Sequence, residues 1–130
     1  MITHLLDSDR LIDYLDDRRG ARSLLAPFIE ARQIATSIIV LGEIHEGLLG
    51  DAQRSLKLSS LNDFLGAVPA LTIDPATAQV FADIRSALRR SGQIINDHDI
   101  WIAATALQHD LTLISRDRHF DRIPGLKRHV

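Results

Sequence analysis

The stretch ITHLLDSDRLIDYL, residues 2–15, contains the pattern that decides the fold. Residues 2–6 form a short apolar run, typical of a buried strand, and the run ends at Asp7. Ser8 can cap a helix that begins at once, because apolar residues then recur at helical spacing as far as Leu15. The stretch therefore predicts a strand that leads directly into a helix, with an acidic residue at the junction.

The rest of the chain repeats this alternation of strands and helices. Helices are predicted between Gly20 and Ile29, from the capping Ser37 to Gly47 or Gly50, over residues 52–65, from Pro75 to Arg90, and from Asn96 or Asp97 to Gln108. Strands are predicted at residues 34–36, 68–73, 111–114 and, as a short tail, 125–130. Pro69 indicates an edge or irregular strand. Because alternating strands and helices form parallel sheets covered on both faces, we expect one three-layer α/β/α domain, residues 1–130, around a mostly parallel sheet of four or five short strands.

The composition is that of an ordinary globular chain, with 45% hydrophobic and 25% charged residues. There is no cysteine, which excludes disulfides and Cys-based zinc sites and fits a reducing cytoplasm. The N-terminus lacks the pattern of a signal peptide, and no apolar run reaches the roughly 18 residues that a membrane helix needs. We therefore expect a cytoplasmic protein with no membrane contact.

The formal net charge of −2 argues mildly against a nucleic-acid binder. However, if four of the 17 acidic side chains hold a metal ion, the remaining 13 face 15 basic ones. All the basic residues except Lys57 and Lys127 are arginines, which suit bidentate phosphate contacts. A coding bias toward arginine explains the same composition, and the sequence leaves both explanations open.

Four acidic residues are expected at one rim of the sheet. Asp7 and Asp117 each follow a predicted strand, Asp99 lies in the first turn of a helix, and Glu43 lies about two turns into another. Ligands of an open parallel sheet bind beyond the carboxyl ends of its strands. A hard divalent cation such as Mg²⁺ or Mn²⁺ would remove the repulsion between clustered carboxylates and could activate water. The alternative is that these acids are ordinary turn and helix-end residues.

Four segments carry a resemblance to one known family. In chain order they are LLDSDRLIDYL, SIIVLGEIHEG, GQIINDHDIWIAATAL and LTLISRDRHFDRIPGL. They resemble the motifs of PIN-domain ribonucleases of the VapC toxin type: a strand ending in Asp before Thr or Ser, a helix carrying one Glu, an acid that opens a helix with Ile-Ala-Ala-Thr-Ala, and Ser/Thr-Arg-Asn/Asp after a strand. The resemblance covers nearly the whole chain, in order, and it implies a PIN-like fold.

The resemblance also implies a role for each matching position. Asp7 and Asp99 would bind Mg²⁺ or Mn²⁺, and Glu43 and Asp117 would do so directly or through water. The supporting residues implied are Ser8, through its hydroxyl group, and Arg116, which could contact a substrate phosphate.

Three further acids depart from the family pattern or adjoin it. Asp9 stands where Asn is commoner, and Asp97 lies two residues before Asp99. Asp99 is preferred because it directly precedes Ile-Trp-Ile-Ala-Ala. Glu46, one helical turn from Glu43, is interpreted as a solvated acid rather than a peripheral ligand.

The function that the resemblance implies is a metal-dependent endoribonuclease toxin that hydrolyses RNA, is silenced by a VapB-like antitoxin and forms a homodimer. One alternative is a phosphatase like the haloacid dehalogenases, with Asp7 of the Asp-Ser-Asp sequence as nucleophile. That class needs a suitably placed lysine, and neither Lys57 nor Lys127 follows a convincing strand end. The other alternative is a catalytically silent PIN-like domain that only binds partners.

Two other features could serve RNA binding or be structural. Arg85, Arg89 and Arg90 lie near the end of one predicted helix, where cations complement the helix dipole and could also steer RNA. His98 lies between two acids, and we interpret it as an exposed helix-start residue.

Overall fold

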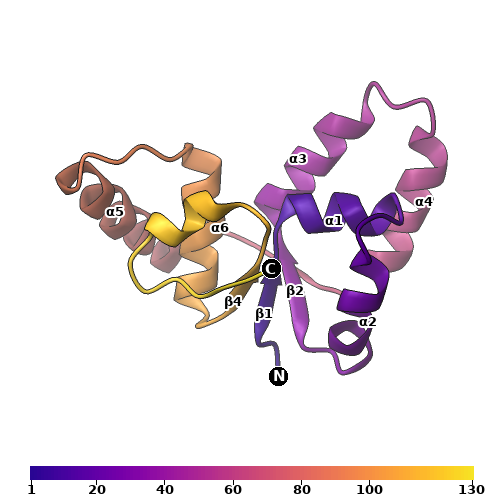
Figure 1. The fold of residues 1–130 in the computed structure, drawn as a ribbon, viewed down its shortest axis with the longest axis horizontal. Helices are drawn as coiled ribbons and strands as arrows, with labels where there is room; N and C mark the ends of the chain where they lie inside the picture. Colours follow the sequence, from indigo (N-terminus) through magenta and orange to yellow (C-terminus); the bar gives the residue numbers. More distant parts are fainter.

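A five-stranded sheet forms the centre of the computed structural model, which describes residues 1–130 (Figure 1). Its strands are β1 (His4–Leu6), β2 (Ile34–Ser37), β3 (Ala70–Leu71), β4 (Thr112–Ile114) and β5 (Arg128–His129). The helices are α1 (Ser8–Leu15), α2 (Ala21–Glu30), α3 (Ile38–Leu48), α4 (Arg54–Leu65), α5 (Pro75–Arg90) and α6 (Asp97–Gln108), with a 3-10 helix η1 at Arg118–Arg122.

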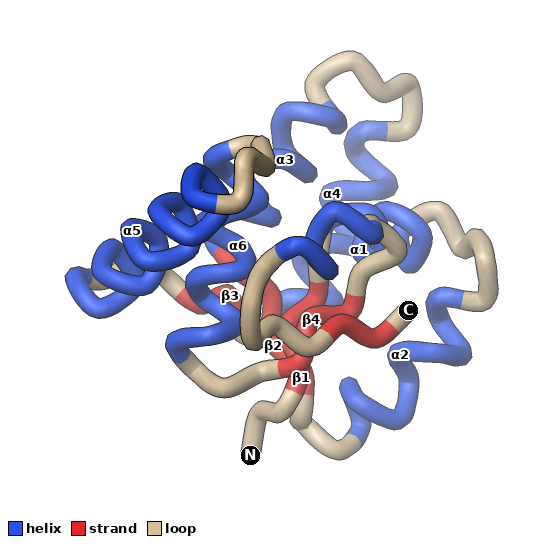
Figure 2. Tube along the Cα trace, turned by 60° about the vertical axis from the view of Figure 1, so that its left-hand side comes forward, coloured by secondary structure: helices blue, strands red, loops and turns tan.

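All four strand pairings are parallel, in the order β3-β2-β1-β4-β5. Helices α5 and α6 pack together on one side of β1, and α1, α2, α3 and α4 lie on the other side (Figure 1). The view of Figure 2 shows the strands enclosed between these two groups of helices. The predicted three-layer α/β fold with a parallel sheet is therefore confirmed, including the number of strands.

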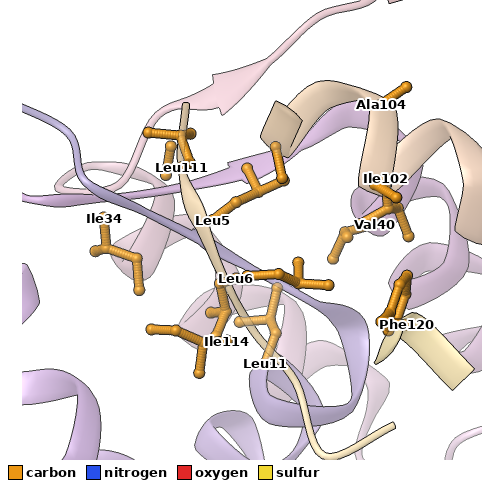
Figure 3. Close-up of a cluster of buried hydrophobic side chains, with 14 of the residues drawn as sticks. Leu5, Leu6, Leu11, Ile34, Val40, Ile102, Ala104, Leu111, Ile114 and Phe120 are labelled. Carbon is orange, nitrogen blue, oxygen red and sulfur yellow. The ribbon is translucent and has the colours of Figure 1, made fainter. Parts of the chain in front are cut away.

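The central strand β1 is buried on both faces, as in other parallel sheets covered by helices. Leu5 and Leu6 are both fully buried. Leu6 points toward a group formed by Val40 of α3, Ile102 of α6 and Phe120 of η1 (Figure 3). Burial of each large apolar side chain contributes about 1.5–3 kcal/mol, so this core holds the end of β1 in a fixed position.

The local signals for helix starts and strand ends are mostly confirmed. The Ser37 hydroxyl accepts from the Val40 N–H at 3.1 Å and caps α3, and Asp74 and Thr77 form a reciprocal capping box at the start of α5. β3 is an edge strand as Pro69 indicated, although it is shorter than the predicted 68–73. It is shorter because the N–H of Val68 instead bonds to the end of α4, and Pro69 has no N–H to donate.

The prediction that Ser8 caps α1 is wrong. Ser8 is the first residue of the helix, and the N-cap position belongs to Asp7, whose side chain caps no backbone N–H. The Ser8 hydroxyl donates to Glu43 instead, at 3.3 Å from Oε2. Both side chains at this junction are thus directed into the rim beyond the sheet.

None of the helices has both the length and the apolar character that crossing a membrane requires.

Candidate active site

The centre of the candidate site is the junction of β1 and α1, beside the end of β4. The Asp7 side chain is only 4% exposed, and the Asp7 N–H donates to the Ile114 carbonyl at 3.0 Å. The next residue after β4, Ser115, donates its hydroxyl to Asp7 Oδ2 at 2.7 Å and accepts from the Asp117 N–H at 3.0 Å. Parallel pairing of β1 and β4 therefore brings Asp7 and Asp117 together, with Ser115 between them.

Ser115 belongs to this candidate site, although its sequence position alone did not mark it as a candidate. It is fully buried and makes hydrogen bonds to two of the four predicted acids. The signal was present, because a serine directly before Arg116 is part of the last motif. The role of this serine depends on its contacts with Asp7 and Asp117, which form only when the sheet is folded.

Glu43 reaches the same rim from α3. Its Oε2 accepts from Ser8, and His98 Nε2 lies 3.9 Å from the same oxygen. His98 Nε2 also lies 3.8 Å from Asp99 Oδ1, in the first turn of α6. The half-exposed His98 ring thus lies between the acids of α3 and α6.

Burial of these acids shifts their protonation toward the neutral form. Burial raises the pKa of Asp7 to about 7; the Ser115 hydrogen bond opposes this rise, and the charges of Asp9 and Asp99 add to it. Burial also raises the pKa of Glu43, where His98 opposes the rise and Asp99 adds to it. Asp99 therefore lies within electrostatic reach of both Asp7 and Glu43.

The pKa of Asp99 is raised in the same way. Burial is the largest cause, His98 opposes it, and the charge of Asp117 adds to it. Asp117 itself caps η1, because its Oδ1 accepts from the His119 N–H at 2.9 Å. Asp117 also lies 2.6 Å from the His119 ring nitrogen Nδ1.

The carboxylate oxygens at the rim are suitable ligands for a hard divalent cation. Asp7 Oδ1, Asp9 Oδ1 and Glu43 Oε1 are buried and have no hydrogen-bond partner. A buried carboxylate oxygen without a partner carries a desolvation cost, and Mg²⁺ and Mn²⁺ prefer such oxygen ligands. No group of three or more His, Asp or Glu side chains is already assembled around one point.

The three additional acids occupy different surroundings. Asp9 adjoins the site, because its Oδ2 accepts from the Arg116 N–H at 2.9 Å. Asp97 is 64% exposed and forms an ion pair with Arg85 of α5, so it is directed away from the rim. Glu46 is exposed and only contributes the smallest cause of the raised pKa of Glu43.

The partly exposed Arg116 side chain is paired with an acid of the same chain. Its Nε and Nη2 donate to the two carboxylate oxygens of Asp13 at 3.0 and 3.3 Å. The structure shows this partner on α1, and the contact with substrate phosphate that the resemblance implied stays a prediction. Asp13 was not among the predicted site residues.

Comparison with known proteins gives consistent matches over nearly the whole chain. The sequence model of the PIN domain matches residues 4–126. Ribonuclease VapC2 of Haemophilus influenzae is 29% identical over 128 residues, which are 98% of this chain and 96% of the relative. Ribonuclease VapC19 of Mycobacterium tuberculosis is 31% identical over 125 residues, which are 95% of this chain and 96% of the relative.

Solved structures match the same fold. VapBC2 from Rickettsia felis, bound to a DNA fragment from its promoter, has a TM-score of 0.89 at 24% identity and covers 99% of this chain and 98% of its own. A toxin-antitoxin complex from Klebsiella pneumoniae has a TM-score of 0.73 at 28% identity, with 95% of both chains covered.

Proposed function

The chain belongs to the PIN-domain family, and from this membership we propose that it is a metal-dependent endoribonuclease, the toxin of a toxin–antitoxin pair that acts in the cytoplasm. Relatives of similar length that cover almost the whole chain are named as ribonucleases. The observation that carries the proposal is the acidic rim, with buried carboxylate oxygens that have no partner.

We assign Asp7 and Asp99 as the direct ligands of Mg²⁺ or Mn²⁺, with Glu43 and Asp117 binding directly or through water. When bound, the cation would lower the pKa of a water molecule and neutralise charge on a phosphate oxygen. The protein's own contribution is orientation: Ser115 fixes Asp7 and the backbone of Asp117, while the Ser8 hydroxyl fixes Glu43.

Substrate RNA would approach the exposed side of this rim. Asp99, Asp117 and His98 are partly or well exposed, whereas Asp7 lies at the buried end. A phosphodiester could thus reach the acids from solvent while the apolar core excludes water from behind Asp7.

The test is RNA cleavage by the purified chain with Mg²⁺ or Mn²⁺, with EDTA as the metal-free condition. Asp99→Asn is expected to lower the rate at least a hundredfold, in line with the loss of a metal ligand. Asp97→Asn is the matched control, because Asp97 lies in the same turn and pairs with Arg85, and it should retain the wild-type rate. Full activity of Asp99→Asn, or full activity in EDTA, would refute the proposal.

We further propose a VapB-like antitoxin as partner and a homodimer as the assembled state. Several structural neighbours come from toxin–antitoxin systems, and this supports the proposal that an antitoxin is the partner. An apolar groove between α1 and α3, lined by Ile12, Leu15, Ile44 and Leu48, extends to Glu43, so a segment bound there would lie beside the acidic rim. Inhibition of RNA cleavage by the product of an adjacent small gene would test the partner, and light scattering would test the dimer.

The alternatives from the sequence are less well supported. Lys57 binds Asp16 and Asp51 at 3.0 and 2.6 Å, away from Asp7, so it is not the lysine that a haloacid-dehalogenase-like phosphatase needs. A silent binding domain has no need for buried acids whose oxygens have no partner. Failure to bind Mn²⁺ in calorimetry would favour the silent domain.

A further inference from the structure

Asp13 is a charged residue with almost no solvent exposure. It lies on the inner face of α1 and is 1% exposed. A buried carboxylate is costly unless it is paired, and Asp13 is paired with three guanidinium groups. Arg19 donates at 2.9 Å, Arg116 at 3.0 Å, and Arg10 forms an ion pair at 3.6 Å.

Arg116 differs from the other two arginines in its place in the chain. Arg10 and Arg19 lie within α1 and the turn after it, so their contacts with Asp13 are local. Arg116 comes from the loop after β4, and it uses both Nε and Nη2 on the two oxygens of Asp13. Such a forked contact fixes orientation as well as distance.

The loop that Arg116 anchors contains Ser115 and Asp117, two residues of the candidate site. Ser115 bonds to Asp7, and the Arg116 N–H bonds to Asp9, so the same loop also meets the first turn of α1. From the opposite side, Arg128 of β5 donates to the Ser115 carbonyl at 3.1 Å. The Asp13–Arg116 pair is therefore the side-chain anchor between the loop and the second half of α1.

We propose that Asp13 is a positioning residue that acts through Arg116 to hold Ser115 and Asp117 in register with Asp7. In this role, Arg116 contributes to the reaction by holding the loop after β4 in place, and not by contacting substrate phosphate. This inference rests on the proposed metal-dependent activity, and it concerns how the protein shapes the metal site.

Mn²⁺ affinity, measured by calorimetry without RNA, tests the inference separately from catalysis. Arg116→Ala is expected to weaken Mn²⁺ binding about tenfold, the size typical for residues that orient metal ligands. Arg116→Lys should weaken it by a similar factor, because lysine keeps the charge and loses the fork. A phosphate contact predicts the opposite pattern: unchanged Mn²⁺ affinity in both variants, and RNA binding that is kept by lysine and lost by alanine.

A double-mutant cycle tests whether Asp13 acts through Arg116. Asp13→Asn should lower Mn²⁺ affinity about as much as Arg116→Ala, and the double variant should lose no more than either single variant. Arg19→Ala is the matched control, because it removes another partner of Asp13 that does not touch the loop. It should leave Mn²⁺ affinity within about twofold of wild type.

The outcomes separate this inference from the proposed function. Unchanged Mn²⁺ affinity in Arg116→Ala, additive losses in the double variant, or an equal loss in Arg19→Ala would overturn the positioning role. If Asp13→Asn does not fold, the Mn²⁺ affinities of the alanine and lysine variants at the partly exposed Arg116 still distinguish a positioning role from a phosphate contact. Wild-type protein that binds Mn²⁺ without cleaving RNA would refute the proposed function alone, and wild-type protein that binds no Mn²⁺ would refute both.

Discussion

Replacement of Asp7 by Asn should stabilise the metal-free protein, and by an amount that grows with pH. The pKa of Asp7 is raised from its ordinary value of 3.8 to about 7, mainly by burial. Between these two values the folded chain holds a proton that the unfolded chain has released. Stability is therefore lost as pH rises through this window, and the loss is complete above the folded-state pKa.

The size of this effect follows from the two pKa values. The raised pKa of Asp7 lowers the free energy of unfolding by about 4 kcal/mol at pH 8, where the folded chain must ionise this carboxyl group, and by about 1.5 kcal/mol at pH 5, where the folded chain keeps the proton that the unfolded chain releases. Asn carries no charge, and its side-chain oxygen can still accept the hydrogen bond from Ser115. The advantage of Asp7→Asn over wild type should thus be larger at pH 8 than at pH 5 by about 2–3 kcal/mol.

Urea denaturation in EDTA at pH 5 and pH 8 measures this difference. The control is Asp83→Asn on the exposed face of α5, where the side chain stays in water in both states, and its effect should be the same at both pH values. Added Mn²⁺ should reverse the order, because it stabilises wild type and cannot bind the variant as tightly. An Asp7→Asn effect that does not change between pH 5 and pH 8 would refute the argument that burial of this carboxylate opposes folding.

Three other substitutions give separate expectations. Ser115→Ala removes the hydrogen bond that lowers the pKa of Asp7, so Mn²⁺ binding should weaken at pH 7 and recover as pH rises, which calorimetry across pH would measure. Ser37→Ala removes the cap of α3 and should lower the free energy of unfolding by about 1 kcal/mol in urea. Phe120→Ala leaves a cavity under η1 and should cost about 3–5 kcal/mol; a cost below about 1 kcal/mol would mean that this side chain is not part of the core.

Much of the fold could be predicted from the sequence because its signals are local. The apolar run before Asp7 and the Asp74-Pro75 helix start each depend on neighbouring residues, and both predictions agree with the structure. The position of Asp7 and Asp117 at one rim follows from the rule that parallel strands end on the same side. Strand length was less predictable, since β3 depends on how α4 ends.

The contacts within the site could not be predicted in this way. Asp13 looks like one more charge on an amphipathic helix, and its burial depends on Arg116, which lies more than a hundred residues further along the chain. The choice between Asp97 and Asp99 likewise rested on a motif, whereas in the structure Arg85 draws Asp97 toward α5. Both contacts join residues that lie apart in the sequence, and a periodic pattern carries no information about such pairings.

Ion pairs between arginines and aspartates also limit how much of the arginine-rich composition is available to bind RNA. If every basic residue were unpaired, the chain outside the proposed metal site would attract RNA electrostatically. Seven of the thirteen arginines instead form ion pairs with aspartates of the same chain, at positions 10, 18, 19, 22, 85, 116 and 128. Of the remaining arginines, Arg118 and Arg122 lie in η1, directly after Asp117, and both are exposed. Positive charge available to an RNA backbone near the acidic rim is therefore expected on η1, and overall charge is a poor guide to where RNA would bind.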